Sequence, residues 1–190
     1  MSQPTAIPPI PPVLPDASQL AWLKGFIRDV PDFPQPGILF RDITPLLQNP
    51  EALRYVIEAM VTRHRDMDIE QVVGIESRGF IFGTPLAYLL GAGFVPVRKL
   101  GKLPGPTVRQ EYALEYGTNT LEMQADAIKP GQRVLVVDDL LATGGTTAAS
   151  VKLVERLGAE VVSLAFLIEL TALGGRQLLA GRDVYALLAY

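Results

Sequence analysis

A pair of carboxylates and a loop of small residues stand together in one run of the sequence. Asp138 and Asp139 are followed closely by Ala142-Thr-Gly-Gly-Thr146. Glycines allow backbone N–H groups to close around an anion, and the threonine hydroxyls supply further donors. Carboxylates beside such a loop can bind sugar hydroxyls or lie near a divalent metal. The run therefore predicts a site for a sugar phosphate.

A strand and a helix must position this run. Residues 134–137 are four consecutive aliphatic residues, as expected for a strand buried on both faces of a parallel sheet. Ligands of such sheets bind beyond the carboxyl ends of the strands, where the two aspartates fall. A helix predicted over 146–157 would direct unpaired N–H groups and its positive dipole end at the loop. A plain strand–turn–helix with Thr146 as its N-cap is the alternative, but the acids and threonines favour the anion site.

A second strand end carries polar residues of a similar kind. Residues 71–75 are predicted as a strand and 79–90 as a helix, with Glu76, Ser77 and Arg78 in the turn between them. The helix start can bind an anion, and the guanidinium of Arg78 adds a fixed charge for a phosphate or pyrophosphate. Taken alone, the segment would favour a helix-cap loop with a solvated arginine.

A basic segment follows the next predicted strand, residues 93–98. Residues 99–112 contain glycines, prolines and the basic residues Lys99, Lys102 and Arg109, without a regular period. They are predicted to form a long loop, and such loops in compact domains are usually functional or disordered. Two short strands are predicted after it, near 115–116 and 120–123.

Two further segments could act on an aromatic base. Glu115 could be a general acid if burial raised its pKa, although it could equally be a surface glutamate on an exposed strand. Phe40 could stack on a base while neighbouring backbone groups read its edge. From physical chemistry alone, Phe40 could also be a core residue beside a salt-bridged Arg41.

Composition limits the class of protein. The 190 residues are 48% hydrophobic and 19% charged, which indicates one soluble globular domain. A net charge of −3 gives no sign of a nucleic-acid or membrane surface. The absence of cysteine excludes disulfides, and a single histidine excludes a histidine-rich zinc site. That histidine, His64, lies in a polar run and is predicted to be a solvated helix end.

The order of elements predicts an α/β protein. Residues 1–16 are proline-rich and are predicted to be a flexible tail, and 17–190 a single domain. Alternating strands and helices imply a mostly parallel sheet. No targeting segment is evident, which makes the cytoplasm the expected location. The remaining predicted elements are a helix over 18–28, a strand over 38–40, a helix beginning at Pro50 with Asn49 as N-cap, strands over 133–138, 160–168 and 184–190, and a short helix over 173–179.

Five ordered motifs resemble the type I phosphoribosyltransferases and, among them, the adenine-specific members. They lie at residues 33–42, 76–80, 98–106, 114–117 and 138–146, and the resemblance extends from residue 18 to 190. It implies an α/β fold with a central, mostly parallel sheet flanked by helices, a small hood and a flexible closing loop. It also implies transfer of a 5-phosphoribosyl group from phosphoribosyl pyrophosphate to adenine, giving AMP and pyrophosphate. Mg²⁺ and a cytoplasmic homodimer belong to the same expectation.

The resemblance also implies roles for individual residues. Glu115 is the expected catalytic acid or base. The expected adenine-binding residues are Leu39, Phe40 and Arg41. The expected ribose-phosphate residues are Asp138, Asp139, Ala142, Thr143, Gly144, Gly145 and Thr146. The expected pyrophosphate residues are Glu76, Ser77, Arg78, Arg98, Lys99 and Lys102, with Arg98 reaching across a dimer interface. Mg²⁺ is expected to bind through substrate and water, near Asp138 and Asp139.

Two other functions are compatible with part of the pattern. A related enzyme for hypoxanthine, xanthine or orotate would keep the phosphate loop and change the base-reading segment, so the segments around Phe40 and Glu115 argue against it. A non-catalytic regulator that senses phosphoribosyl pyrophosphate and binds nucleic acid should carry a DNA-binding domain or a basic face, and neither is evident in the sequence.

Overall fold

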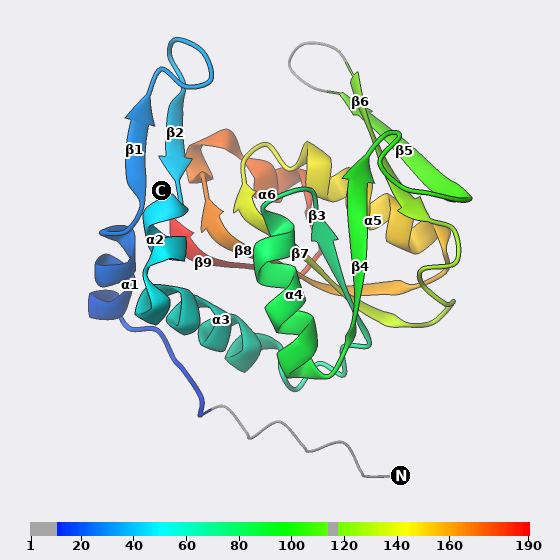
Figure 1. Cartoon of the computed structure of the whole chain (residues 1–190), viewed down its shortest axis with the longest axis horizontal. Helices are drawn as coiled ribbons and strands as arrows, with labels where there is room; N and C mark the ends of the chain where they lie inside the picture. Colours follow the sequence, from blue (N-terminus) through cyan, green and yellow to red (C-terminus); the bar gives the residue numbers. More distant parts are fainter. Residues whose placement is uncertain (1–10, 114–117) are drawn as a thin grey trace. The chain divides into compact units, whose positions relative to one another are not determined.

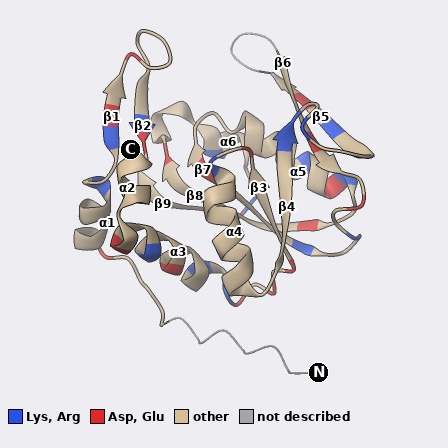
Figure 2. Cartoon of the chain, in the orientation of Figure 1, with Lys and Arg blue, Asp and Glu red and all other residues tan. Residues whose placement is uncertain are grey.

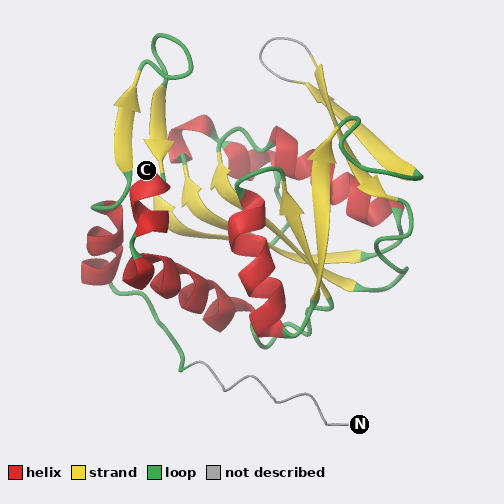
Figure 3. Cartoon of the chain, viewed as in Figure 1, coloured by secondary structure: helices red, strands yellow, loops and turns green. Residues whose placement is uncertain are grey.

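The structure is a computed structural model that describes residues 11–113 and 118–190. The chain forms two compact units, Met1–Thr62 and Arg63–Tyr190. Figure 1 traces the elements along the chain, and Figure 3 distinguishes helices from strands. None of the helices in the described part is long and apolar enough to cross a membrane.

The first unit combines short helices with a two-stranded antiparallel sheet. Its elements are α1 (Ala17–Lys24), β1 (Arg28–Pro31), β2 (Leu39–Asp42), α2 (Thr44–Gln48) and most of α3 (Pro50–His64). Asp16 caps α1, because its carboxylate accepts the N–H of Gln19 at 2.9 Å while the Gln19 side chain accepts the N–H of Asp16. Val30 pairs with Phe40 across the small sheet.

One helix prediction in this unit holds only at its start, and one N-cap prediction is confirmed. The predicted helix 18–28 ends at Lys24, and Arg28–Pro31 is instead a strand, because it pairs with a segment eleven residues further along. The N-cap of α3 is confirmed, since Asn49 Oδ1 accepts the N–H groups of Glu51 and Ala52 at 3.0 and 2.9 Å. The sequence pattern did not indicate α2, which has only five residues.

The second unit is built on a seven-stranded sheet in the order β5-β6-β4-β3-β7-β8-β9. The five strands β4, β3, β7, β8 and β9 are parallel, and the hairpin β5–β6 joins antiparallel to β4, which confirms the predicted mostly parallel sheet. The strands are β3 (Gln71–Ile75), β4 (Gly93–Lys99), β5 (Thr107–Ala113), β6 (Thr118–Gln124), β7 (Arg133–Leu141), β8 (Glu160–Glu169) and β9 (Val184–Ala189). The helices are α4 (Gly79–Leu90), α5 (Gly145–Arg156), the single-turn η1 (Thr171–Leu173) and α6 (Gly175–Leu178).

The strand order places a crevice between β3 and β7. The chain leaves β3 through α4 toward β4 on one side, and leaves β7 through α5 toward β8 on the other. Right-handed crossovers in opposite directions put α4 and α5 on opposite faces of the sheet, as Figure 1 shows. Ligands of open α/β sheets bind at such a switch point, beyond the carboxyl ends of the strands.

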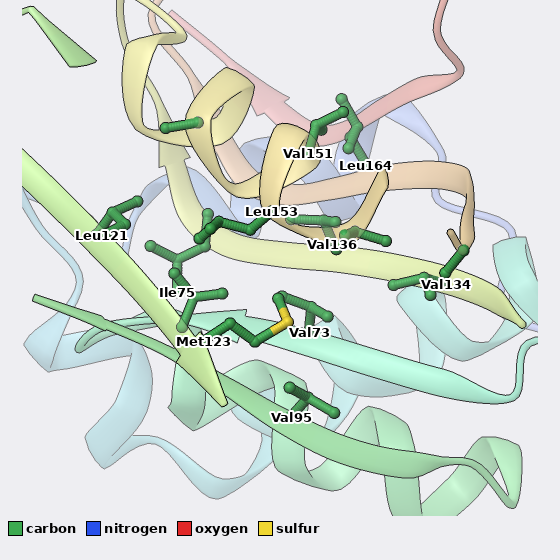
Figure 4. Close-up of a cluster of buried hydrophobic side chains, with 14 of the residues drawn as sticks. Val73, Ile75, Val95, Leu121, Met123, Val134, Val136, Val151, Leu153 and Leu164 are labelled. Carbon is green, nitrogen blue, oxygen red and sulfur yellow. The ribbon is translucent and has the colours of Figure 1, made fainter. Parts of the chain in front are cut away.

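Aliphatic side chains hold α5 against the sheet. Figure 4 shows Leu153 of α5 beside Val136 of β7 and Val151 of α5 beside Leu164 of β8, and all four side chains are buried. Met123 of β6 is buried in the same cluster, so the core extends under the hairpin. Burying an aliphatic side chain of this size stabilises the fold by about 1.5–3 kcal/mol. This core fixes the start of α5 relative to the end of β7.

Three predictions in this unit need correction. Residues 99–112 are not one loop, because Thr107–Ala113 forms β5 and pairs with β6, Thr118–Gln124. The predicted strand near 115–116 lies outside the described residues, and the predicted strand 120–123 lies within β6. The predicted short helix 173–179 begins with the 3₁₀ turn η1 and continues as α6. His64 is not a solvated helix end, because it is completely buried.

A polar network explains the burial of His64. Its Nε2 lies 3.1 Å from Ser163 Oγ, and that hydroxyl donates to Asp183 Oδ2 at 2.7 Å. Because the single hydroxyl hydrogen of Ser163 is used on Asp183, Ser163 Oγ accepts from His64, so Nε2 carries a hydrogen. Arg63 binds both oxygens of Asp183 at 2.7 and 2.8 Å. The partners lie far from His64 in the sequence, which is why local polarity was misleading.

Candidate active site

A cavity of about 370 Å³ lies at the switch point of the second unit. The ends of β3 and β7 both line it, so the structure brings the two polar strand ends together. The predicted residues in its lining are Glu76, Ser77, Arg78, Lys99, Asp138, Asp139, Ala142, Thr143, Gly144, Gly145 and Thr146. Tyr112, Asn119, Leu121, Leu140 and Thr147 also line it and were not predicted.

The loop after β7 has the backbone that an anion site requires. Gly144 has φ +85°, in the left-handed region, and directly precedes the first turn of α5. A Cβ at this position would lie 2.7 Å from the carbonyl oxygen of Gly175, so a side chain has no room. The first N–H groups of α5 have no partner one turn earlier in the helix and face the loop side. The arrangement suits a phosphate at the N-terminus of α5.

The hairpin adds a hydroxyl to this loop. Thr146 Oγ1 lies 3.3 Å from the hydroxyl of Tyr112 at the end of β5, and both residues line the cavity. Sequence reasoning missed Tyr112 because residues 99–112 carried no strand period. The pairing of β5 with β6 brings it to the site.

The two aspartates form a coupled acidic pair at the cavity wall. The N–H of Asp139 donates to Asp138 Oδ1 at 2.9 Å. Burial, together with the neighbouring charge of Asp139, raises the pKa of Asp138 well above its usual value. Burial also raises the pKa of Asp139, although the adjacent Arg78 guanidinium opposes this shift.

Arg78 joins the two strand ends. Its Nε lies 3.0 Å from Asp139 Oδ2, and the Asp139 side chain is only 5% exposed. The close approach depends on Gly79, where a Cβ would lie 2.7 Å from the carbonyl oxygen of Val137. A glycine at the start of α4 therefore lets the turn after β3 pack on the end of β7, which places a cation beside the acidic pair.

Glu76 differs from the other predicted pyrophosphate residues, because it is an acidic side chain that is hydrogen-bonded to two of them. Its carboxylate accepts Arg98 Nε and Nη2 at 3.3 and 3.1 Å and the N–H of Lys99 at 2.9 Å. These bonds, led by that to the Arg98 side chain, hold the pKa of Glu76 below its usual value. Glu76 thus fixes the basic end of β4. Arg98 pairs with Glu76 within its own chain, and its Nη1 donates to the carbonyl oxygen of Lys102 at 3.0 Å.

The predicted base-reading residues lie in the first unit. Leu39, Phe40 and Arg41 form most of β2. Phe40 packs edge-to-face on Phe33, with ring centroids 5.1 Å apart, and Arg41 forms an ion pair with Asp29. Their role toward adenine stays a prediction. Glu115, the expected catalytic acid, lies outside the described residues.

Comparison with known proteins agrees with this geometry. Residues 42–177 match the family model of the phosphoribosyl transferase domain. The adenine phosphoribosyltransferase of Acaryochloris marina is 62% identical over 168 residues, which cover 88% of this chain and 99% of that protein. The chain therefore belongs to the phosphoribosyltransferase family, and within it to the adenine phosphoribosyltransferases.

Solved structures agree with the fold. The crystal structure of adenine phosphoribosyltransferase from Thermoanaerobacter pseudethanolicus superposes with a TM-score of 0.88 at 53% identity, covering 90% of this chain and 99% of that one. That of the Saccharomyces cerevisiae enzyme gives a TM-score of 0.86 at 43% identity, covering 91% and 100% of the two chains. The yeast structure is a complex with adenine and D-2,5-dideoxy-2,5-imino-altritol 1,6-bisphosphate.

Proposed function

We propose that this chain transfers the 5-phosphoribosyl group of phosphoribosyl pyrophosphate to adenine, giving AMP and pyrophosphate, a purine-salvage reaction. The observation that carries the proposal is the shared cavity at the switch point. There a helix start suited to an anion, an acidic pair and an arginine ion-paired with a buried aspartate all line one space. The similar enzymes are adenine phosphoribosyltransferases, and one of them binds adenine.

The ribose 5-phosphate occupies the loop in this proposal. Backbone N–H groups and hydroxyls of Ala142–Thr146 bind the phosphate, and the Asp138–Asp139 pair accepts from the ribose hydroxyls. A carboxylate pair near the sugar also favours positive charge that develops at the anomeric carbon as its bond to pyrophosphate breaks.

The pyrophosphate occupies the side of the cavity formed by the end of β3 and the basic segment. Arg78 binds it through its guanidinium, with Ser77 beside it, and Lys99 and Lys102 add positive charge where the leaving group becomes an anion. Glu76 acts here by holding Arg98 and Lys99. If Arg98 reached a partner subunit, it would have to leave Glu76.

Adenine is read by β2 in the same proposal. Main-chain groups of Leu39 and Arg41 bind its edge, and Phe40 packs on its face. As the bond from the purine nitrogen to the ribose carbon forms, the purine loses a proton, and Glu115 is the proposed base. In the reverse direction the same residue is the acid.

The donor set fits a magnesium ion that arrives with the substrate. Asp138 and Asp139 both line the cavity, and Asp139 Oδ2 is buried with the Arg78 guanidinium 3.0 Å away. No group of three or more acidic or histidine side chains in 11–113 and 118–190 could hold a metal ion alone. Magnesium commonly keeps several waters and binds through substrate phosphates, and Asp138 and Asp139 are the nearest carboxylates. When bound, it would neutralise charge on the pyrophosphate.

A homodimer and a cytoplasmic location complete the proposal, as does a single catalytic domain over 17–190 with a dispensable tail over 1–16. Family resemblance supports the dimer. Light scattering on the purified full chain should give about twice the mass of the 20.6 kDa monomer.

Product analysis tests the proposed reaction. The full chain is incubated with phosphoribosyl pyrophosphate, Mg²⁺ and, separately, adenine, hypoxanthine, xanthine or orotate. We expect AMP and an equal amount of pyrophosphate with adenine, and far slower nucleotide formation with the other bases. Absence of AMP, or faster reaction with another base, would overturn the assignment.

A further inference from the structure

Glu122 lies at the centre of the hairpin, and the proposed reaction assigns it no role. It stands in the middle of β6, directly opposite Arg98 on β4 and Arg109 on β5. Cross-strand neighbours lie on the same face of a sheet, so the carboxylate stands between two arginine positions. Figure 2 shows the basic end of β4 beside this hairpin. Glu122 is only 1% exposed.

The contacts of Glu122 converge from one segment. Its Oε1 accepts the N–H groups of Lys102 at 2.9 Å and Leu103 at 3.0 Å. Its Oε2 accepts the hydroxyl of Thr107 at 3.3 Å and lies 3.6 Å from Arg109 Nε. Burial alone would raise the pKa of Glu122, but these donors together hold it below its usual value. The group is therefore a buried, ionised carboxylate that binds the segment 102–109.

Lys102 is held from both sides as a result. Its N–H donates to Glu122, and its carbonyl oxygen accepts Arg98 Nη1 at 3.0 Å. Arg98 is in turn fixed by Glu76. Two carboxylates, one at the end of β3 and one inside the hairpin, thus set the backbone on which the basic side chains of Lys99 and Lys102 stand.

We propose that Glu122 is a positioning residue that fixes the Lys102 backbone for binding the pyrophosphate group of phosphoribosyl pyrophosphate. The inference rests on the proposed function, which assigns pyrophosphate to this side of the cavity. Glu122 acts through the segment and needs no contact with the substrate. A carboxylate that acted only through its charge would repel pyrophosphate, so removing that charge should strengthen binding of phosphoribosyl pyrophosphate. If Glu122 instead positions Lys102, removing the charge should weaken binding.

Glu122→Gln tests the proposal in the full chain at fixed Mg²⁺. The amide keeps the shape of the side chain, but its NH₂ group would face the donors of Thr107 and Arg109. We expect the dissociation constant of phosphoribosyl pyrophosphate to rise roughly tenfold, the scale of a lost charged hydrogen bond. AMP carries no pyrophosphate, so its dissociation constant should change less than about twofold. Glu111→Gln, an exposed glutamate on β5, makes the same charge change and should leave both constants unchanged.

Three outcomes of this comparison overturn the proposal. Tighter binding of phosphoribosyl pyrophosphate by Glu122→Gln would mean that Glu122 acts only through repulsion by its charge. Unchanged binding would mean that Glu122 has no effect on this ligand. Equal weakening of AMP and phosphoribosyl pyrophosphate would indicate a general defect in the fold.

Thr107→Val is the second variant, and it decides the question if Glu122→Gln does not fold. It removes one donor to Glu122 and keeps the side-chain shape. Phosphoribosyl pyrophosphate binding should weaken about threefold, again without change for AMP. An unchanged constant would contradict the proposal.

A double-mutant cycle examines whether Glu122 acts through Lys102. Lys102→Ala should weaken phosphoribosyl pyrophosphate binding strongly in the native chain and much less in the Glu122→Gln background. If the losses of binding free energy from the two substitutions were additive, Glu122 would not act through Lys102. If the native chain formed no AMP from adenine, the proposed function would fail instead, which is a different result from any of these.

Discussion

At the scale of single residues, the acidic pair is the most unusual feature of the cavity. The carboxyl groups of Asp138 and Asp139 lie close together in the wall of the cavity, and the pKa values of both are raised. Such a pair disfavours the folded state once both groups ionise, and it persists at sites where ligands use it. Arg78 offsets part of this cost through its ion pair with Asp139.

The raised pKa of Asp138 gives a pH-dependent prediction. In the folded chain Asp138 keeps its proton above the pH at which it ionises in the unfolded chain, which is about 4. Folding then binds protons, so this residue lowers stability as pH rises from about 4 toward the folded pKa. Asp138→Asn should remove this loss, and the variant should be more stable than the native chain at neutral pH but not at pH 4.

Urea unfolding at several pH values measures this effect. Asp126→Asn, a change at an exposed aspartate, is the control and should follow the native curve. Parallel stability curves for Asp138→Asn and the native chain would contradict the account. The same variant should lose activity, because it removes a carboxylate from the sugar site.

Gly144 gives a prediction with a matched control. Gly144→Ala adds both a strained backbone and a contact of 2.7 Å with the carbonyl oxygen of Gly175. Gly131 has a similar φ of +82°, but a Cβ there meets nothing within 4 Å. Gly131→Ala should cost about 1–2 kcal/mol of stability, the usual cost of the left-handed conformation.

Gly144→Ala should cost more than Gly131→Ala and should also weaken phosphoribosyl pyrophosphate binding by at least about tenfold, because the anion loop must move. Calorimetry of unfolding and of ligand binding measures both quantities. Equal stability losses for the two variants, with binding intact, would mean that the loop does not need its close packing on Gly175.

At the scale of elements, local patterns and long-range pairing differ in what the sequence reveals. The strand, acids and glycine loop before α5 could be predicted because they are contiguous. The strand β5 could not, because residues 107–113 show no clear alternation and become a strand by pairing with β6. Glu122 and Tyr112 were missed for the same reason, since their roles depend on register within the hairpin.

The burial of His64 is a second case of this limit. Its partners, Ser163 and Asp183, come from the start of β8 and the turn before β9, about a hundred residues away. The charged neighbours of His64 in the sequence predicted exposure, yet tertiary packing buries its imidazole beside Ser163. No local signal distinguishes the two outcomes.

Ser163→Ala tests the network that closes the end of α3. The change removes the hydroxyl that joins His64 to Asp183 and leaves a buried imidazole N–H without that acceptor. Stability should fall by about 1–3 kcal/mol, the cost of an unsatisfied buried polar group. Urea unfolding measures the loss, while AMP affinity should stay unchanged. A variant as stable as the native chain would show that the network contributes nothing.

At the scale of the whole molecule, the N-terminal segment is the part that the proposed reaction does not need. Two of its described residues nevertheless form hydrogen bonds. The Val13 N–H donates to Thr62 Oγ1 at 3.0 Å, and Asp16 caps α1. We therefore expect this segment to contribute to the stability of the fold and not to catalysis.

Two deletions separate these contributions. Removal of residues 1–12 should leave activity and stability unchanged, because the cap and the Val13 bond remain. Removal of 1–16 should keep activity but cost about 1 kcal/mol of stability through the lost cap. Asp16→Ala in the full chain should reproduce most of that loss. A marked fall in AMP formation after either deletion would make the segment part of the active protein.

In the proposed reaction, the switch-point cavity of the second unit binds the ribose phosphate and the pyrophosphate side by side. A crystal structure of the chain with AMP, pyrophosphate and Mg²⁺ tests this directly. We expect the 5′-phosphate in the loop Ala142–Thr146, the ribose hydroxyls at Asp138 and Asp139, and pyrophosphate near Arg78. A 5′-phosphate bound anywhere else, with this loop empty, would contradict it.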